Sequence, residues 1–387
     1  MRPSQTGFVI ASAFLAMVCG APTAVATPLT LRQAAAAAGI YVGVATSPAE
    51  LASGVDAIVA RDFNSLTPEN QMKWSELAPA PGVYDFGPAD ALVDYAEANG
   101  MRVRGHTLVW GRPNGPPAWL DAELAAAPDP AAHLRDLMLD HIDTVAGRYA
   151  GRIESWDVVN EPLSITSGAF DPSNPYFQLL GEDYIADAFR AARAVDPSAK
   201  LFLNELGTER IPAKFAGLVA LVEGLRADGV PIDGVGFQGH FLTRPNRAAL
   251  EAQLRTFAEM GLLVEITELD LPLVIFSGDA DPLASQAQAY ADVFAACLAV
   301  SACRGVTTWG VTDADSWLDH FDLLRFFAPN QPLLFGADGL PKPAYDAVLA
   351  TLVAVPEPAT LNQLWFAIGA LAIRARSQHR SGARPGA

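Results

Sequence analysis

Basic residues are scarce in this sequence: 26 Lys and Arg stand against 43 Asp and Glu, which leaves a formal net charge of −17. Nucleic-acid phosphates bind to basic surfaces, and no cluster of Lys or Arg occurs before the extreme C-terminus, so we exclude a nucleic-acid partner. Patterns of metal ligands are lacking too, because His133 and His141 fall on one predicted helix without a third ligand nearby, and Asp279 with Asp281 is more typical of a solvated turn. We therefore expect no metal and no cofactor, and an uncharged or carbohydrate substrate.

Apolar runs long enough for a permanent membrane span, which needs about 20 residues, are also missing, although a short run occurs near each end of the chain. At the N-terminus, Arg2 precedes an apolar run at 8–18 and small residues that end at Ala26. This pattern predicts an export signal peptide over residues 1–26. A lipoprotein signal at Cys19 is the alternative, but the bulky Val18 stands where such signals have a small residue.

The C-terminus carries a second candidate address. A Pro-Glu-Pro sequence at 356–358 is followed by an apolar stretch at 361–373 and then by Arg374, Arg376 and Arg380. This order resembles the PEP-CTERM sorting signal of Gram-negative bacteria. The resemblance implies that residues 355–387 engage a membrane sorting machinery transiently, and that the protein is exported to the cell surface, extracellular matrix or medium of such a bacterium. A docking helix followed by a loose tail is the alternative.

Cysteine is rare, with 3 residues in the chain. Removal of the signal peptide would leave Cys297 and Cys303, which are close enough in sequence to form a short disulfide loop in an exported protein. Two free buried thiols are the alternative.

Between these two signals there is no Gly/Ser linker, charge block or repeat, so residues 30–354 are predicted to form one domain. Short β-rich runs alternate with Ala/Leu-rich helical segments, such as those at 130–150, 183–195, 212–228, 247–260 and 285–299. The eight β-rich runs lie at 40–45, 63–67, 102–108, 153–159, 201–204, 234–238, 263–267 and 305–309. Alternating strands and helices imply parallel strands, and eight of them predict an α/β fold of the (β/α)8 TIM-barrel type. A doubly wound open sheet is the alternative, and we expect a monomer.

Polar and aromatic side chains gather where these strands end, which is the rim on which barrels build their active sites. Two of them are glutamates: Glu161 follows the fourth strand and Glu268 follows the seventh. Hydrolysis of a glycosidic bond needs a proton for the leaving oxygen and a carboxylate at the anomeric carbon, so a facing pair of carboxyl groups points to a glycosidase. Glu265 lies an odd number of positions from Glu268, so we expect it to face the helices instead.

Six strand-end segments give this pattern a specific resemblance. They are Pro-Glu-Asn-Gln-Met-Lys-Trp at 68–74, Gly-His-Thr-Leu-Val-Trp at 105–110, Asn-Glu-Pro at 160–162, Gly-Phe-Gln-Gly-His at 236–240, Thr-Glu-Leu-Asp at 267–270 and Trp-Gly-Val-Thr-Asp at 309–313. In this order they resemble glycoside hydrolase family 10, whose members are mainly endo-β-1,4-xylanases. Asn-Glu-Pro alone is a weak signal, because several families of barrel glycosidases share it.

The resemblance implies a retaining endo-β-1,4-xylanase acting on xylan or xylo-oligosaccharides, with Glu161 as the acid/base and Glu268 as the nucleophile. His240 is expected to hydrogen-bond Glu268, and Asp270 to hold His240 in the useful tautomer. Asn160 is expected to contact the 2-hydroxyl of the sugar. The remaining sugar contacts implied by the resemblance are Glu69, Asn70, Lys73, His106, Trp110, Gln238, Trp309 and Trp317.

Two other functions fit parts of the pattern. Another retaining β-glycanase, a cellulase or mannanase, is the nearer one, and the group of Glu69, Asn70 and Lys73 with Trp309 argues for xylose because in the resembling family it crowds out a hydroxymethyl substituent. A non-catalytic surface carbohydrate-binding protein would not need both glutamates. The chain departs from the family at 111–117 and at Leu206, where Tyr is common, so we expect altered sugar binding there.

Overall fold

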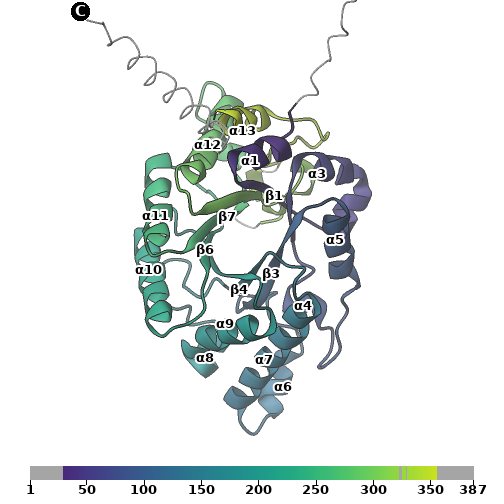
Figure 1. Ribbon diagram of the computed structural model, residues 1–387, viewed down its shortest axis with the longest axis vertical. Coiled ribbons are helices and arrows are strands. Elements are labelled where there is room, and N and C mark those ends of the chain that lie inside the picture. Colours follow the sequence, from purple (N-terminus) through teal and green to yellow (C-terminus); the bar gives the residue numbers. More distant parts are fainter. Residues whose placement is uncertain (1–28, 322–324, 328, 355–387) are drawn as a thin grey trace, which may run out of the picture.

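Eight parallel strands close into a barrel in the order β1 to β8, with β8 pairing back to β1. The computed structural model describes residues 29–321, 325–327 and 329–354, and the helices surround the strands (Figure 1). The strands are β1 (Tyr41–Thr46), β2 (Ser65–Pro68), β3 (Arg102–Trp110), β4 (Ser155–Asn160), β5 (Lys200–Glu205), β6 (Gly234–Phe237), β7 (Leu263–Leu269) and β8 (Cys303–Thr308). The predicted (β/α)8 barrel is confirmed.

The strands form where the sequence predicts them because their side chains are buried on both faces. Interior positions face the barrel axis and the others face the helices, so each strand is almost continuously buried. Glycine is required where two strands approach most closely at the closure: a Cβ on Gly305 of β8 would lie 2.4 Å from the ring of Tyr41 in β1.

Several helices of the outer layer begin at a side-chain cap. Asp129 accepts a hydrogen bond from Ala132 N at the start of α7, and Asp281 does the same for Ala284 N at the start of α12. Asp281 is therefore a helix cap. The helices and short turns are α1 (Leu31–Ala38), α2 (Pro48–Glu50), η1 (Leu51–Val55), α3 (Asp56–Asp62), α4 (Trp74–Leu77), α5 (Gly87–Ala98), α6 (Leu120–Ala126), α7 (Pro130–Arg148), α8 (Pro175–Leu180), α9 (Asp183–Val195), α10 (Pro212–Ala227), α11 (Arg247–Glu259), η2 (Leu273–Phe276), α12 (Pro282–Leu298), η3 (Asp313–Asp315), η4 (Trp317–Asp319), η5 (Arg325–Phe327) and α13 (Pro343–Val353).

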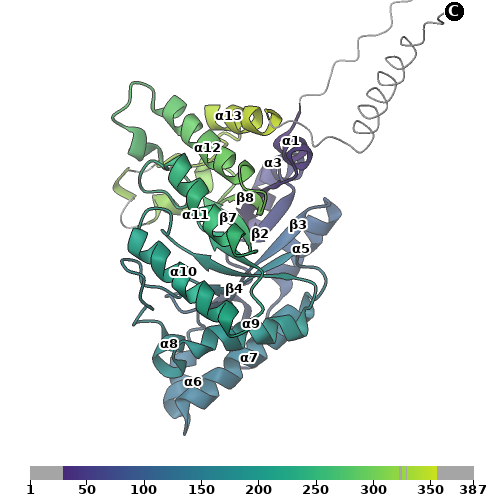
Figure 2. The same ribbon diagram turned by 60° about the vertical axis from the view of Figure 1, so that its left-hand side comes forward.

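The two ends of the described domain meet on one side of the barrel. Helix α13 packs on α12 and on α1, so the last helix completes the outer layer beside the first (Figures 1 and 2). Cys297, near the end of α12, is joined by a disulfide to Cys303 at the start of β8. The expected signal peptide with Cys19, and the expected sorting segment at 355–387, lie outside the described residues. Within the described ranges, no helix is long and apolar enough to cross a membrane.

The barrel interior contains a charged layer below the active-site rim, and it corrects one expectation. Glu265 does not face the helices: it accepts a hydrogen bond from Tyr41 Oη at 2.7 Å and pairs with Arg104, and both partners come from strands that β7 can reach only through the interior. Arg104 also pairs with Asp157. Register shifts on either side of Ile266 break the alternation along β7, so Glu265 and Glu268 both point inward.

Candidate active site

Glu161 and Glu268 both lie at the carboxyl end of the barrel, where they are nearly buried. Their exposed fractions are 9% and 4%. Glu161 follows β4 directly and has a left-handed backbone, with φ of 51°, which is uncommon for a residue with a side chain and typical of functional sites. Its N–H donates to Asn204 O at 3.0 Å, and the N–H of Glu268 donates to Gln238 O at 2.7 Å, so neighbouring strands fix both backbones.

A chain of side-chain amides connects the two carboxyl groups. Gln238 Nε2 donates to Glu161 Oε1 at 2.9 Å and lies 3.3 Å from Asn160 Oδ1. Asn204 Nδ2 donates to the same Asn160 oxygen at 2.9 Å and to Glu268 Oε1 at 2.7 Å. Because both contacts to Asn160 use its oxygen, its Nδ2 group is the end that can serve a sugar hydroxyl.

His240 and Asp270 support Glu268 from the opposite side. His240 Nε2 lies 3.1 Å from Glu268 Oε2, and His240 Nδ1 lies 2.8 Å from Asp270 Oδ2, which also accepts from Trp317 Nε1 at 2.8 Å. Burial alone would lower the pKa of His240, but the carboxylates of Asp270 and Glu268 raise it to about 10. This shift favours the protonated ring, in which both nitrogens carry a hydrogen and face a carboxylate oxygen.

Glu268 is held in its charged form. Burial would raise its pKa, but the hydrogen bond from His240 and the electrostatic influence of His106 lower it below the usual value. His106 is fixed by a contact of 2.9 Å between its Nδ1 and Asp157 Oδ2. The ring of Trp309 stands edge-on to His106 at 5.2 Å and to His240 at 6.1 Å, so it closes this side of the site.

The residues after β2 and at the end of β3 form the adjoining wall. Lys73 Nζ donates to Asn70 Oδ1 at 2.7 Å and lies 4.9 Å from the centre of the Trp110 ring, a cation–π arrangement. Burial lowers the pKa of Lys73, while the carboxylates of Glu268, Glu69 and Glu161 act in the opposite direction. The structure thus gathers the sequence-predicted site residues around the two glutamates, and Glu69 acts there electrostatically on Lys73. The cysteines lie apart from them, in the disulfide between α12 and β8.

Sequence reasoning missed four residues of this site. Asn204 ends β5, so the rule that polar residues at strand ends line the site could have found it. Asp157 lies inside β4 and shows its role only through His106. Arg112 and Asp171 come from two different loops and meet only in the folded protein, where Arg112 pairs with Asp171 and its Nε lies 3.3 Å from Glu161 Oε2.

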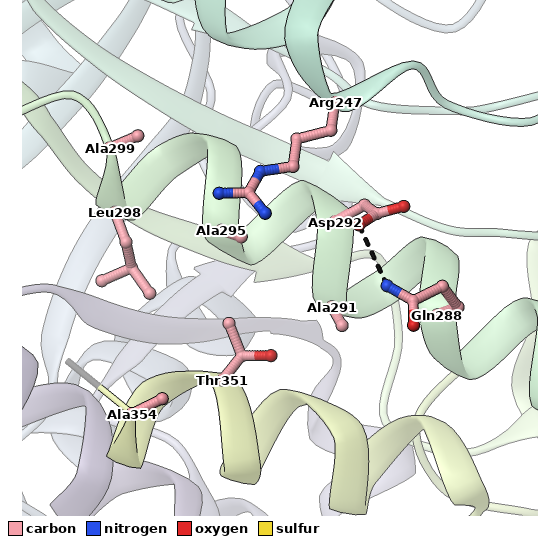
Figure 3. A pocket seen from close by; sticks show the side chains of 9 residues that line it. All are labelled: Arg247, Gln288, Ala291, Asp292, Ala295, Leu298, Ala299, Thr351 and Ala354. Carbon is pink, nitrogen blue, oxygen red and sulfur yellow. Dashed lines mark hydrogen bonds between the residues drawn. The ribbon is translucent and has the colours of Figure 1, made fainter.

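A separate hollow of about 450 Å³ lies on the outer side of the barrel between α11, α12 and α13 (Figure 3). The sole hydrogen bond drawn there joins Gln288 Nε2 to Asp292 Oδ1 at 3.0 Å. Its lining is mostly alanine and aliphatic carbon and contains neither glutamate of the site: Arg247, Gln288, Ala291, Asp292, Ala295, Leu298, Ala299, Thr351 and Ala354.

Fold and site together define a barrel glycosidase: two buried glutamates at the carboxyl ends of the strands, one held as an anion and the other in contact with neutral and charged donors. Residues 30–351 match Glycosyl hydrolase family 10, and the chain belongs to this family.

Relatives of known function are similar over most of the chain. A β-1,4-xylanase of Dictyoglomus thermophilum is 42% identical over 298 residues, which cover 74% of this chain and 82% of that protein. Endo-1,4-β-xylanase A of Phanerodontia chrysosporium is 37% identical, covering 85% of this chain and 78% of its own length. The crystal structure of xylanase 10B from Thermotoga petrophila RKU-1 in complex with xylobiose superposes with a TM-score of 0.76 at 36% identity, covering 84% of this chain and 98% of that one.

Proposed function

We propose that this protein is an endo-β-1,4-xylanase that hydrolyses xylan with retention of anomeric configuration, with Glu161 as acid/base and Glu268 as nucleophile. The observation that carries the assignment is the asymmetry of the two carboxyl groups. Glu268 accepts from Asn204 and from the protonated His240, so it is a charged and oriented carboxylate. Glu161 has one oxygen on a neutral amide, so it is the group suited to exchange a proton.

In the first step, Glu268 attacks the anomeric carbon while Glu161 gives its proton to the leaving oxygen, which forms a covalent glycosyl-enzyme. The ester bond removes the charge of Glu268, so Glu161 in its ionised form can then take a proton from water. The water attacks the same carbon from the face that the leaving group vacated, and Glu268 departs as a carboxylate. Two inversions give net retention.

Sugar binding is assigned to the polar and aromatic wall around the glutamates. The amide of Asn160 is suited to the 2-hydroxyl, where hydrogen bonds strengthen in the transition state. The amine of Lys73 and the rings of Trp110, Trp309 and Trp317 offer the charged and flat apolar contacts that sugars require. In the resembling family, the group that corresponds to Glu69, Asn70 and Lys73 with Trp309 crowds out a hydroxymethyl substituent, which favours xylose over glucose. The relative from Thermotoga petrophila is in complex with xylobiose, which supports the same substrate.

One experiment tests substrate and stereochemistry together. Purified protein is incubated with xylan, glucomannan and carboxymethylcellulose, reducing ends are measured, and early products are followed by NMR. We expect hydrolysis of xylan and a first product in the β-anomeric form. Faster hydrolysis of glucomannan or cellulose would reassign the substrate, and a first product of α configuration would remove Glu268 as nucleophile.

We also propose that residues 30–354 are the catalytic domain of an exported protein acting as a monomer, with residues 1–26 as signal peptide and residues 355–387 as a PEP-CTERM-like sorting segment. The composition of the two end segments supports this proposal. Mass spectrometry of the protein from its native host should give a start near Thr27 and no residues beyond about Thr360. A full-length chain recovered from the cytoplasm would refute it.

A further inference from the structure

Arg112 follows β3 and reaches across to Glu161 from a neighbouring loop. Its Nε lies 3.3 Å from Glu161 Oε2, its Nη1 pairs with Asp171, and its Nη2 donates to Leu163 O at 3.1 Å. The side chains are largely shielded from water, with exposed fractions of 16% for Arg112, 11% for Glu161 and 7% for Asp171. One guanidinium is therefore shared between the acid/base and a second carboxylate.

The other groups near Glu161 do not duplicate this contact. Gln238 from β6 holds Oε1 and is neutral. Glu205 from β5 is fully buried and pairs with Lys214 of α10 at 2.8 Å; burial raises the pKa of Glu205 to about 7, and the charge of Glu161 acts in the same direction. Lys73 acts on Glu161 electrostatically, but its amine is bonded to Asn70. Glu268 of β7 is joined to Glu161 through Gln238, Asn160 and Asn204.

From this arrangement we propose that Arg112 is a positioning residue for Glu161, and that the sharing of its guanidinium between Glu161 and Asp171 sets the alkaline limit of the hydrolysis. The inference rests on the proposed role of Glu161 as acid/base. Glycosylation needs Glu161 with its proton, and a cation 3.3 Å away favours the ionised form. Asp171 pairs with the same guanidinium, so its negative charge offsets part of the positive charge that faces Glu161.

The contacts also change with the state of Glu161. As a carboxylate it accepts from Gln238 through Oε1, and its Oε2 lies in ion-pair contact with Arg112 Nε at 3.3 Å. When Oε2 carries the proton it is a poor acceptor for a cationic donor, so the guanidinium favours Asp171 and the backbone oxygen of Leu163. Arg112 therefore has a partner both when Glu161 is protonated and when it is ionised. Its guanidinium lies closer to Glu161 in the ionised form than in the protonated form.

Substitutions of Arg112 and Asp171 test this inference, because they should shift the pH profile in opposite directions. Arg112→Gln removes the cation and keeps an amide donor, so the alkaline limb of the kcat/KM profile on xylan should move to higher pH by about one unit. Asp171→Asn keeps the oxygen that accepts from Ser173 N at 2.9 Å and removes the competing charge, so the limb should move to lower pH. Arg112→Lys keeps the charge and should leave the limb near its wild-type position.

Two further measurements separate the possible failures. An aryl xylobioside with a good leaving group needs no acid, so its alkaline limb should stay unchanged in all three variants. Thermal unfolding identifies any variant that does not fold. Three outcomes would each overturn the inference. The alkaline limb on xylan could stay fixed in a folded Arg112→Gln, it could shift in the same direction in Arg112→Gln and Asp171→Asn, or it could shift equally on xylan and on the aryl xylobioside. Absence of xylan hydrolysis by the wild-type protein at every pH would instead overturn the proposed function.

Discussion

Individual residues divide the work at this site because their surroundings differ. Glu268 lies between Asn204 and a protonated His240, which both donate to it. Glu161 has Gln238 on one oxygen and shares Arg112 with Asp171 on the other. A nucleophile must remain ionised and an acid/base must change state during the cycle, and these two environments meet those two requirements.

Removal of the Glu161 side chain should affect two substrates differently. In Glu161→Ala, we expect the rate on xylan to fall by about 10² to 10⁴, the usual contribution of general acid catalysis. The first step on an aryl xylobioside with a good leaving group should survive, because that leaving group needs little proton assistance. Steady-state and burst kinetics on both substrates measure the difference.

Glu154 provides the matched control for this variant. Glu154 directly precedes β4, whereas Glu161 directly follows it. Glu154 is therefore at the opposite end of the barrel, where it is exposed. Glu154→Ala should keep wild-type rates on both substrates. Equal losses on xylan and on the aryl glycoside in Glu161→Ala would show that Glu161 is not the acid.

At the scale of elements, the strands and the rim were predictable from sequence because each rests on a local pattern. The run at 263–267 was predicted as a strand, and β7 covers Leu263–Leu269, with Glu268 near its carboxyl end. The inward direction of Glu265 was not predictable, because it depends on register shifts against β8 that no pattern within β7 reveals. Alternation along a strand is reliable only while pairing stays regular.

The loop after β3 marks a second limit of sequence reasoning. Residues 111–117 were recognised as unusual, but their consequence depends on a distant loop. Asn174 caps α8, and a Cβ on Gly111 would lie 2.2 Å from the side-chain oxygen of Asn174. The two loops therefore fit together only because residue 111 is glycine. The same pair of loops brings Asp171 to Arg112. Contacts between loops arise from the closed barrel and leave no local periodicity to detect.

For the molecule as a whole, closure of the outer layer depends on its first and last helices. Asp62 is fully buried and joins them: its Oδ1 accepts from Leu31 N of α1 at 3.4 Å and from Tyr345 Oη of α13 at 2.8 Å. Val348 and Leu352 of α13 are buried in the same core cluster as Leu31. Packing and the hydrogen bonds of Asp62 therefore join α13 to α1 within the described domain.

A shortened chain tests this whole-molecule arrangement. A protein of residues 27–354 should have the same kcat/KM on xylan and the same unfolding temperature as one that retains residues 355–387, because α13 is then intact. A protein that ends at Lys342 lacks α13 and should lose about 1.5 to 3 kcal/mol of unfolding free energy for each of Val348 and Leu352, and more because Asp62 loses its bond from Tyr345. Urea denaturation and xylan assays of the two proteins measure the contrast.

Two outcomes would contradict this arrangement. If the chain that ends at Lys342 were as stable as the longer one, α13 would not be part of the cooperative fold. If the chain that ends at Ala354 were unstable, residues beyond Ala354 would contribute to the packing.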